Sequence, residues 1–171
     1  MKLLEEPKII EAVSAVMAAQ ERSERSLSFM DITAFEGGAI GTGVKRMVEQ
    51  IGACVSEISG LLETLRESED PVPPPAPADT SEKELEAAQE RYWRERMRLV
   101  HAVERCALRV DAARAQGDVA FMDGIMEIRE SGLEVEEQAA LTDIYLALKD
   151  VYDAAAEASE VLRLRIARGE M

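Results

Sequence analysis

The sequence predicts an all-α protein whose long helices pack as a helical hairpin, a coiled coil or a bundle. Its few aromatic residues, three Phe, three Tyr and one Trp, accompany abundant Ala, Glu, Leu and Arg, which favours helix over strand. Two apolar series alternate spacings of four and three, a coiled-coil repeat that must be buried against another helix. The first seam comprises Ile40, Val44, Met47, Ile51, Cys54, Ile58, Leu61 and Leu65. The second seam comprises Leu141, Tyr145, Leu148, Tyr152, Ala155, Ser159, Leu162 and Ile166.

The N-terminal part of the chain predicts two helices. Pro7 stands where a first turn begins, and apolar residues then recur at helical spacing, which predicts a helix over about 6–28. Glycines between residues 31 and 43 favour a loop or an irregular helix start. The first seam predicts a second helix over about 40–67. Gly52, Ser56 and Gly60 share one face of it, where a neighbouring backbone could approach closely.

A proline-rich segment divides the chain. Residues 71–77 contain five prolines, which cannot continue a helix and favour the extended polyproline II conformation. We therefore predict an N-terminal helical hairpin over 1–68, a linker over 69–80 and a C-terminal helical bundle over 81–171. Whether the two helical units pack together is left open by the sequence.

The C-terminal unit is predicted to contain three helices. Ser81 and Glu84 have the spacing of a capping box, so a third helix is expected to begin there. Its apolar stripe runs from Leu85 to Val110, and we expect it to stop at Gln116 and Gly117. A short fourth helix then begins at Asp118 and ends near Gly132. The last helix, about 134–167, carries the second seam.

The charge is strongly acidic and unevenly distributed. The net charge of −14 would repel a phosphate backbone, so direct binding of nucleic acid is not expected. Residues 91–114 contain seven arginines and three acids, whereas residues 115–160 contain twelve acids, one arginine and one lysine. We expect neighbouring helices to pair these charges; the alternative is a basic docking face for an acidic partner.

The two cysteines and the hydropathy profile indicate the cellular compartment of the protein. Cys54 and Cys106 fall at apolar helix positions, where a free thiol behaves as a small hydrophobic group. The sequence shows no secretory leader and no apolar run near eighteen residues, so no membrane span is expected. These features together predict a cytoplasmic protein.

No residue pattern supports a catalytic, cofactor-binding or metal-binding site. His101 is the only histidine, so a di-iron bundle, which needs two Glu-x-x-His motifs, cannot be built. The glycine-rich stretch 37–45 lacks the Gly-Lys-Ser/Thr ending of a phosphate loop. Residues 38–47 faintly resemble the active helix of the chemotaxis response-regulator phosphatases. Thr42 and Gly38 replace that family's catalytic Gln and its acidic partner, so we do not assign the family.

We therefore expect a non-enzymatic helical interaction module, such as an adaptor, a chaperone or an assembly subunit, that requires no cofactor. Its partner would be another protein or a second copy of the chain, bound through the seams, with a homo-oligomer as one outcome. An acidic inhibitor or nucleic-acid mimic that fills a basic groove is the main alternative. A helical phosphatase or a metal-carboxylate bundle is the least favoured one.

Overall fold

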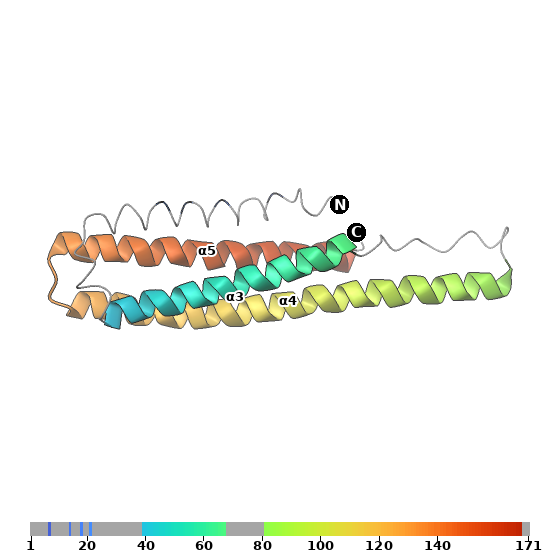
Figure 1. Cartoon of the computed structure of the whole chain (residues 1–171), viewed down its shortest axis with the longest axis horizontal. Helices are drawn as coiled ribbons and strands as arrows, with labels where there is room; N and C mark the ends of the chain where they lie inside the picture. The colour runs from blue at the N-terminus through green and yellow to red at the C-terminus, as the bar shows by residue number, and fades with distance from the viewer. Residues whose placement is uncertain are drawn as a thin grey trace.

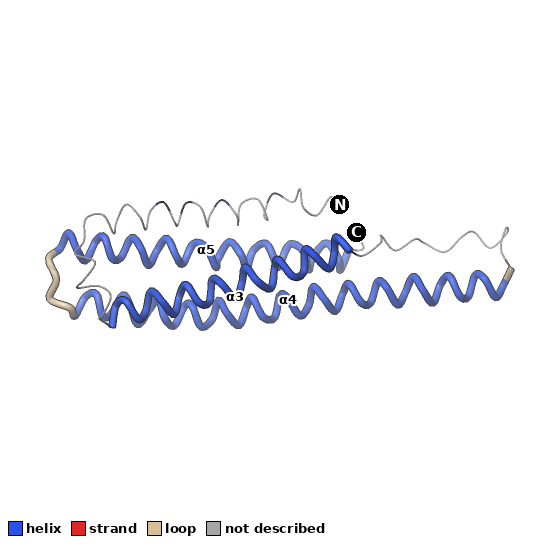
Figure 2. Tube along the Cα trace, in the orientation of Figure 1, coloured by secondary structure: helices blue, strands red, loops and turns tan. Residues whose placement is uncertain are grey.

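The computed structural model of the chain describes residues 39–67 and 81–168, together with Pro7, Ser14, Ala18 and Glu21. Within the two long ranges the chain forms helices α3 (Ala39–Glu67), α4 (Glu82–Glu130) and α5 (Val135–Arg168), and no strand (Figures 1 and 2). The prediction of an all-α fold is confirmed. The helix predicted over 6–28 and the linker predicted over 69–80 lie almost entirely outside the described residues.

The three helices lie side by side, with α4 antiparallel to both α3 and α5 (Figure 1). Apolar residues from all three meet in one core, in which Met47 of α3, Val110 of α4 and Leu162 of α5 are fully buried. Residues on both sides of the predicted linker therefore share a single core. This packing answers the question that the sequence left open for α3.

Helix α4 is the longest element and is uninterrupted over 49 residues. The predicted stop at Gln116 and Gly117 is wrong, and residues 81–168 form two helices where the sequence predicted three. Gly117 has helical backbone and is buried, because the ring of Tyr152 on α5 packs against it. Glycine is present here to make room for a ring and does not end the helix.

The ends of α4 follow the predicted signals. The Glu84 carboxylate accepts hydrogen bonds from the Ser81 backbone N–H at 3.2 Å and from its hydroxyl at 2.5 Å. These bonds lower the pKa of Glu84. At the other end, Gly132 has a φ of +69°, the left-handed conformation in which glycine terminates helices. The predicted start near Ser81 and stop near Gly132 are both confirmed.

The N-terminal part of α4 projects beyond the ends of α3 and α5 (Figure 1). The first buried residue of α4 is Leu99, and none of residues 82–98 is buried. We call residues 82–98 the arm. At 1.5 Å per residue it is about 25 Å long.

Candidate binding surface

The first seam faces the interior of the bundle. Its residues Met47, Cys54 and Leu61 are buried, whereas Val44, Ile51, Ile58 and Leu65 are partly buried against the same core. The backbone of Ile40 belongs to α3, but its side chain lies outside the described residues. The seam is thus occupied by α4 and α5 of the same chain.

The second seam is buried along its whole length. Tyr145 packs against glycines on two helices, since a Cβ atom at Gly124 would collide with its ring and one at Gly43 with its hydroxyl. Two turns further along α5, Tyr152 packs in the same way, since a Cβ atom at Gly117 would lie 2.9 Å from its Cε1. Two tyrosines seven residues apart on α5 therefore fit two glycines seven residues apart on antiparallel α4. The whole seam is buried: Leu141, Tyr145, Leu148, Tyr152, Ala155, Ser159, Leu162 and Ile166.

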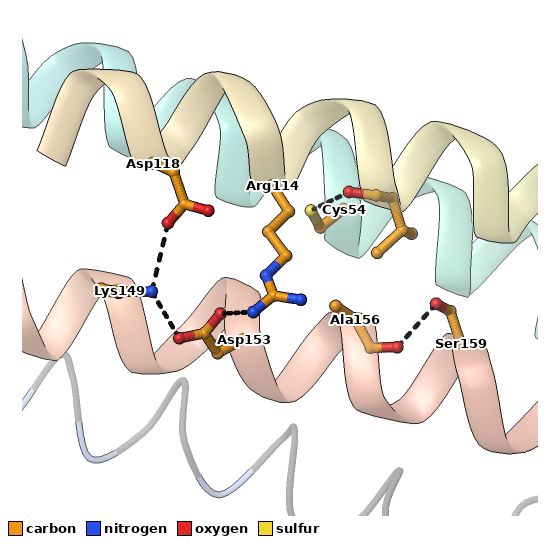
Figure 3. Close-up of polar contacts among 8 residues, drawn as sticks. Cys54, Arg114, Asp118, Lys149, Asp153, Ala156 and Ser159 are labelled. Carbon is orange, nitrogen blue, oxygen red and sulfur yellow. Dashed lines mark hydrogen bonds and ion pairs between the residues drawn. The ribbon is translucent and has the colours of Figure 1, made fainter. Parts of the chain in front are cut away.

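The two cysteines are free and buried. The Cys54 thiol lies 3.9 Å from the carbonyl oxygen of Val110, to which it is placed to donate (Figure 3). Burial raises the pKa of both thiols to about 11, and the Glu57 carboxylate adds to the effect at Cys106. Thiols of this kind are inert at neutral pH, so neither is a candidate nucleophile.

A chain of alternating charges joins α4 to α5 (Figure 3). Lys149 Nζ contacts Asp118 Oδ1 at 3.2 Å and Asp153 Oδ2 at 2.7 Å, and Arg114 contacts Asp153 Oδ1 at 2.7 Å. Burial lowers the pKa of Lys149, but the hydrogen bonds to Asp153 and Asp118 outweigh it and raise the value. Of these contacts, Arg114–Asp153 joins the basic stretch 91–114 to the acidic stretch 115–160 as expected. Arg109 instead pairs with Glu57 of α3 at 2.7 Å.

The residues considered for chemistry are not brought together. His101 is exposed and its Nδ1 lies 3.6 Å from Glu104 on the same helix. The described residues contain no cluster of three or more His, Cys, Asp or Glu side chains that could hold a metal ion. Gly41, Thr42 and Gly43 belong to the first turns of α3, where Gly41 and Gly43 are buried. The described part of the glycine-rich stretch thus forms a packed helix start.

The small residues of α3 face open space. Gly52 and Gly60 have no atom within 4 Å of where a Cβ would stand, so the predicted close helix approach is not made by the described residues. Ser56 and Gly60 instead line a shallow groove of about 180 Å³ between α3 and α4, closed on its other side by Arg105 and Arg109.

The exposed apolar side chains concentrate on α4. Six of the eleven large exposed apolar residues in the described part of the chain lie on this helix, with exposed fractions between 46% and 70%. At 3.6 residues per turn these six share one stripe, on the side of the helix opposite its buried residues. We call this stripe the outer face. It comprises Trp93, Met97, Leu108, Val119, Met122 and Met126.

The apolar stripe predicted from Leu85 to Val110 combines two sides of α4. Trp93 and Met97 are exposed on the outer face, whereas the core side carries Leu99, Val103, Cys106 and Val110. Met97, Leu108 and Val119 are eleven residues apart, as are Leu99 and Val110, so each series keeps to one side of the helix. The offset of two residues places the two series on opposite sides, but it does not say which side is the core.

None of the described helices contains an apolar stretch long enough to cross a bilayer. Comparisons of the chain with protein-family models, with curated proteins and with solved structures find no match. The chemistry of its own surface is therefore the basis for a functional proposal.

Proposed function

We propose that this chain is a non-enzymatic helical protein-interaction module, of the adaptor, chaperone or assembly-subunit type. The seams that suggested this role are packed within the chain, so the binding surface we propose is the outer face of α4. The observation that carries the proposal is the apolar stripe on a helix side with no neighbour among the described residues. Apolar side chains exposed along one side of a helix, here with the exposed acids Glu104 and Asp111 between them, mark a candidate interaction site.

The chemistry of the outer face indicates the kind of partner. Tryptophan and methionine are enriched in interfaces, where methionine side chains adapt to different neighbours. A straight stripe along a helix is best covered by another helix carrying its own apolar stripe. We also propose a cytoplasmic location, which the two free thiols support.

The acidic-mimic alternative receives less support. It requires a continuous acidic patch, but Asp118 and Asp153 pair with Lys149 and Arg114, and Glu57 pairs with Arg109. These pairs interrupt the acidic surface with positive charge. An acidic inhibitor would also bind its target much more weakly as salt is added.

The experiment that tests the proposal is an affinity capture from the source cells with three forms of the immobilised chain. The wild type is compared with Met122→Glu/Met126→Glu and with Val135→Glu, a control at an 80% exposed apolar position outside the outer face. We expect a protein that the wild type and the control retain and the double variant loses. Equal retention by all three forms, or none by the wild type, contradicts the proposal.

A further inference from the structure

We infer that the partner of the outer face is a second copy of this chain, bound with the two α4 helices antiparallel. This inference rests on the proposed function and names the partner. It is drawn from three observations: the distribution of charge along α4, the positions of the apolar residues, and the arm.

The charge of α4 reverses at the middle of the outer face. Residues 91–109 contain six arginines and two glutamates, a net charge of +4, whereas residues 110–128 contain four acids and one arginine, a net charge of −3. In an antiparallel pair the basic half of each copy lies on the acidic half of the other. In a parallel pair, basic halves would face each other and repel.

Along the flank of the outer face that borders α3, the charge changes in the same direction, from basic to acidic. Arg94, Arg98 and Arg105 are exposed along its N-terminal half, and Asp123 and Glu127 stand on the same flank in the C-terminal half. In antiparallel helix pairs, like flanks meet across the interface. The nearest contacts of Arg94 and Arg98 lie within their own helix, to Glu90 and Glu95, so their charges remain at the surface.

Four of the six apolar residues of the outer face are placed symmetrically about the same midpoint. A two-fold axis between Arg109 and Val110 pairs Trp93 with Met126 of the second copy and Met97 with Met122. Leu108 of both copies then lies close to the axis, opposite the exposed Asp111 of the other copy. One operation therefore matches the apolar residues at both ends of the outer face and the opposite charges of its flank, and it produces a closed dimer with identical surfaces on the two copies.

The arm explains why a second copy fits where a short peptide would not. Residues 82–98 bury nothing in the core, and an isolated helix of this length is marginal in water. In the antiparallel pair, the arm of one copy, with Trp93 and Met97, lies on Val119, Met122 and Met126 of the other. The two bundles stand on opposite sides of the α4 pair, because the outer face is opposite the core.

The orientation is tested by disulfide cross-linking of cysteines placed on the outer face of the full chain. Met97→Cys and Met122→Cys chains are expected to cross-link when mixed, and hardly at all when each is alone. Leu108→Cys is expected to cross-link with itself. The wild type is the control, since Cys54 and Cys106 are buried. Cross-linking of Met97→Cys with itself, or of none of these pairs, would overturn the inference.

The charge pairing is tested by reversing it in two chains and measuring mass by light scattering across a concentration series. Arg94→Glu/Arg98→Glu and Asp123→Arg/Glu127→Arg are each expected to dimerise about tenfold more weakly than the wild type, and their mixture to recover the lost affinity. Arg94, Arg98 and Asp123 are exposed and Glu127 is partly buried, so circular dichroism checks that each variant keeps the fold. Unchanged dimerisation in both variants would contradict the inference.

Different results would contradict the proposed interaction module and the inferred self-association. A wild-type chain that stays monomeric at all concentrations, yet loses a captured protein when Met122 and Met126 are replaced by Glu, refutes self-association and leaves the interaction module standing. A chain that neither dimerises nor captures a protein through the outer face refutes both.

Discussion

Replacing a glycine within a long helix is expected to raise or lower the stability of the fold, depending on whether a side chain packs against that glycine. Gly124 is covered by the ring of Tyr145, whereas Gly52 faces open space. Both have helical backbone, so the intrinsic gain from replacement by alanine is the same, about 0.5–1 kcal/mol. The difference between the two sites is therefore a measure of ring packing.

We predict that Gly124→Ala lowers the free energy of unfolding by about 1–3 kcal/mol, because the methyl group displaces the buried Tyr145 ring. Gly52→Ala is the matched control and is expected to raise it by about 0.5–1 kcal/mol. Urea denaturation followed by circular dichroism measures both changes. Similar shifts for the two variants would show that Tyr145 does not pack against Gly124.

The buried thiols and tyrosines make the fold sensitive to alkali. Burial raises the pKa of Cys54 and Cys106 from 9.0 to about 11, and burial with the Glu127 charge raises that of Tyr145 from 10.0 to about 12. At a pH between a group's pKa in the unfolded chain and its higher pKa in the folded chain, the unfolded chain has lost the proton and the folded chain has kept it. Stability is therefore complete below about pH 9 and declines as the pH rises toward 12.

The expected result is a falling urea midpoint between pH 9 and 11, with little change between pH 7 and 8.5. In Cys54→Ala/Cys106→Ala, the decline over pH 9–10 should be smaller relative to that variant's own midpoint at pH 7. A decline of equal size in both proteins would mean that other groups cause it.

At the scale of the elements, the contact of α4 with α5 combines an apolar seam with a short charge network. Lys149 is partly buried and bridges two carboxylates, Asp118 on the other helix and Asp153 on its own. Arg163, by contrast, pairs with Glu160 on the surface of α5 alone. The two pairs allow an ion pair between helices to be compared with one within a helix.

We predict that Lys149→Met destabilises the fold by about 1 kcal/mol, because Asp118 loses its partner at the junction of the two helices. Arg163→Gln is expected to leave stability unchanged, since exposed pairs one turn apart contribute little. Thermal unfolding at low and high salt tests this. A larger loss in Arg163→Gln than in Lys149→Met would contradict the role given to the network.

At the scale of the whole molecule, the seams hold one chain together, and the outer face is the surface that we propose for a partner. Leu162 of the second seam is fully buried, whereas Leu164, two residues away, is 44% exposed. Leu162→Ala should therefore cost about 2–5 kcal/mol and Leu164→Ala no more than about 0.5 kcal/mol.

Mass measurements on the same variants separate core from interface. Under conditions in which both variants remain folded, each is expected to show the same mass profile as the wild type, because neither residue belongs to the outer face. A Leu162→Ala chain that is as stable as the wild type but no longer self-associates would show that the second seam is an interface between chains.

The helical class, the two seams and the two ends of α4 can all be predicted from the amino-acid sequence alone. These features depend on local chemistry: spacing of 3.5 residues, the Ser81–Glu84 pair and a glycine able to take positive φ at 132. Each is encoded within a few turns of one helix, so no knowledge of neighbouring elements is needed.

What each helix faces depends on the tertiary structure. Gly117 has the local signature of a helix stop, but the Tyr152 ring, 35 residues away in the sequence, makes it a packing site within a continuous helix. Met97 and Leu99 are likewise both apolar, and only their distance from α3 and α5 distinguishes surface from core. Contacts between distant segments depend on how helices register against one another, a property that no single stretch of sequence contains.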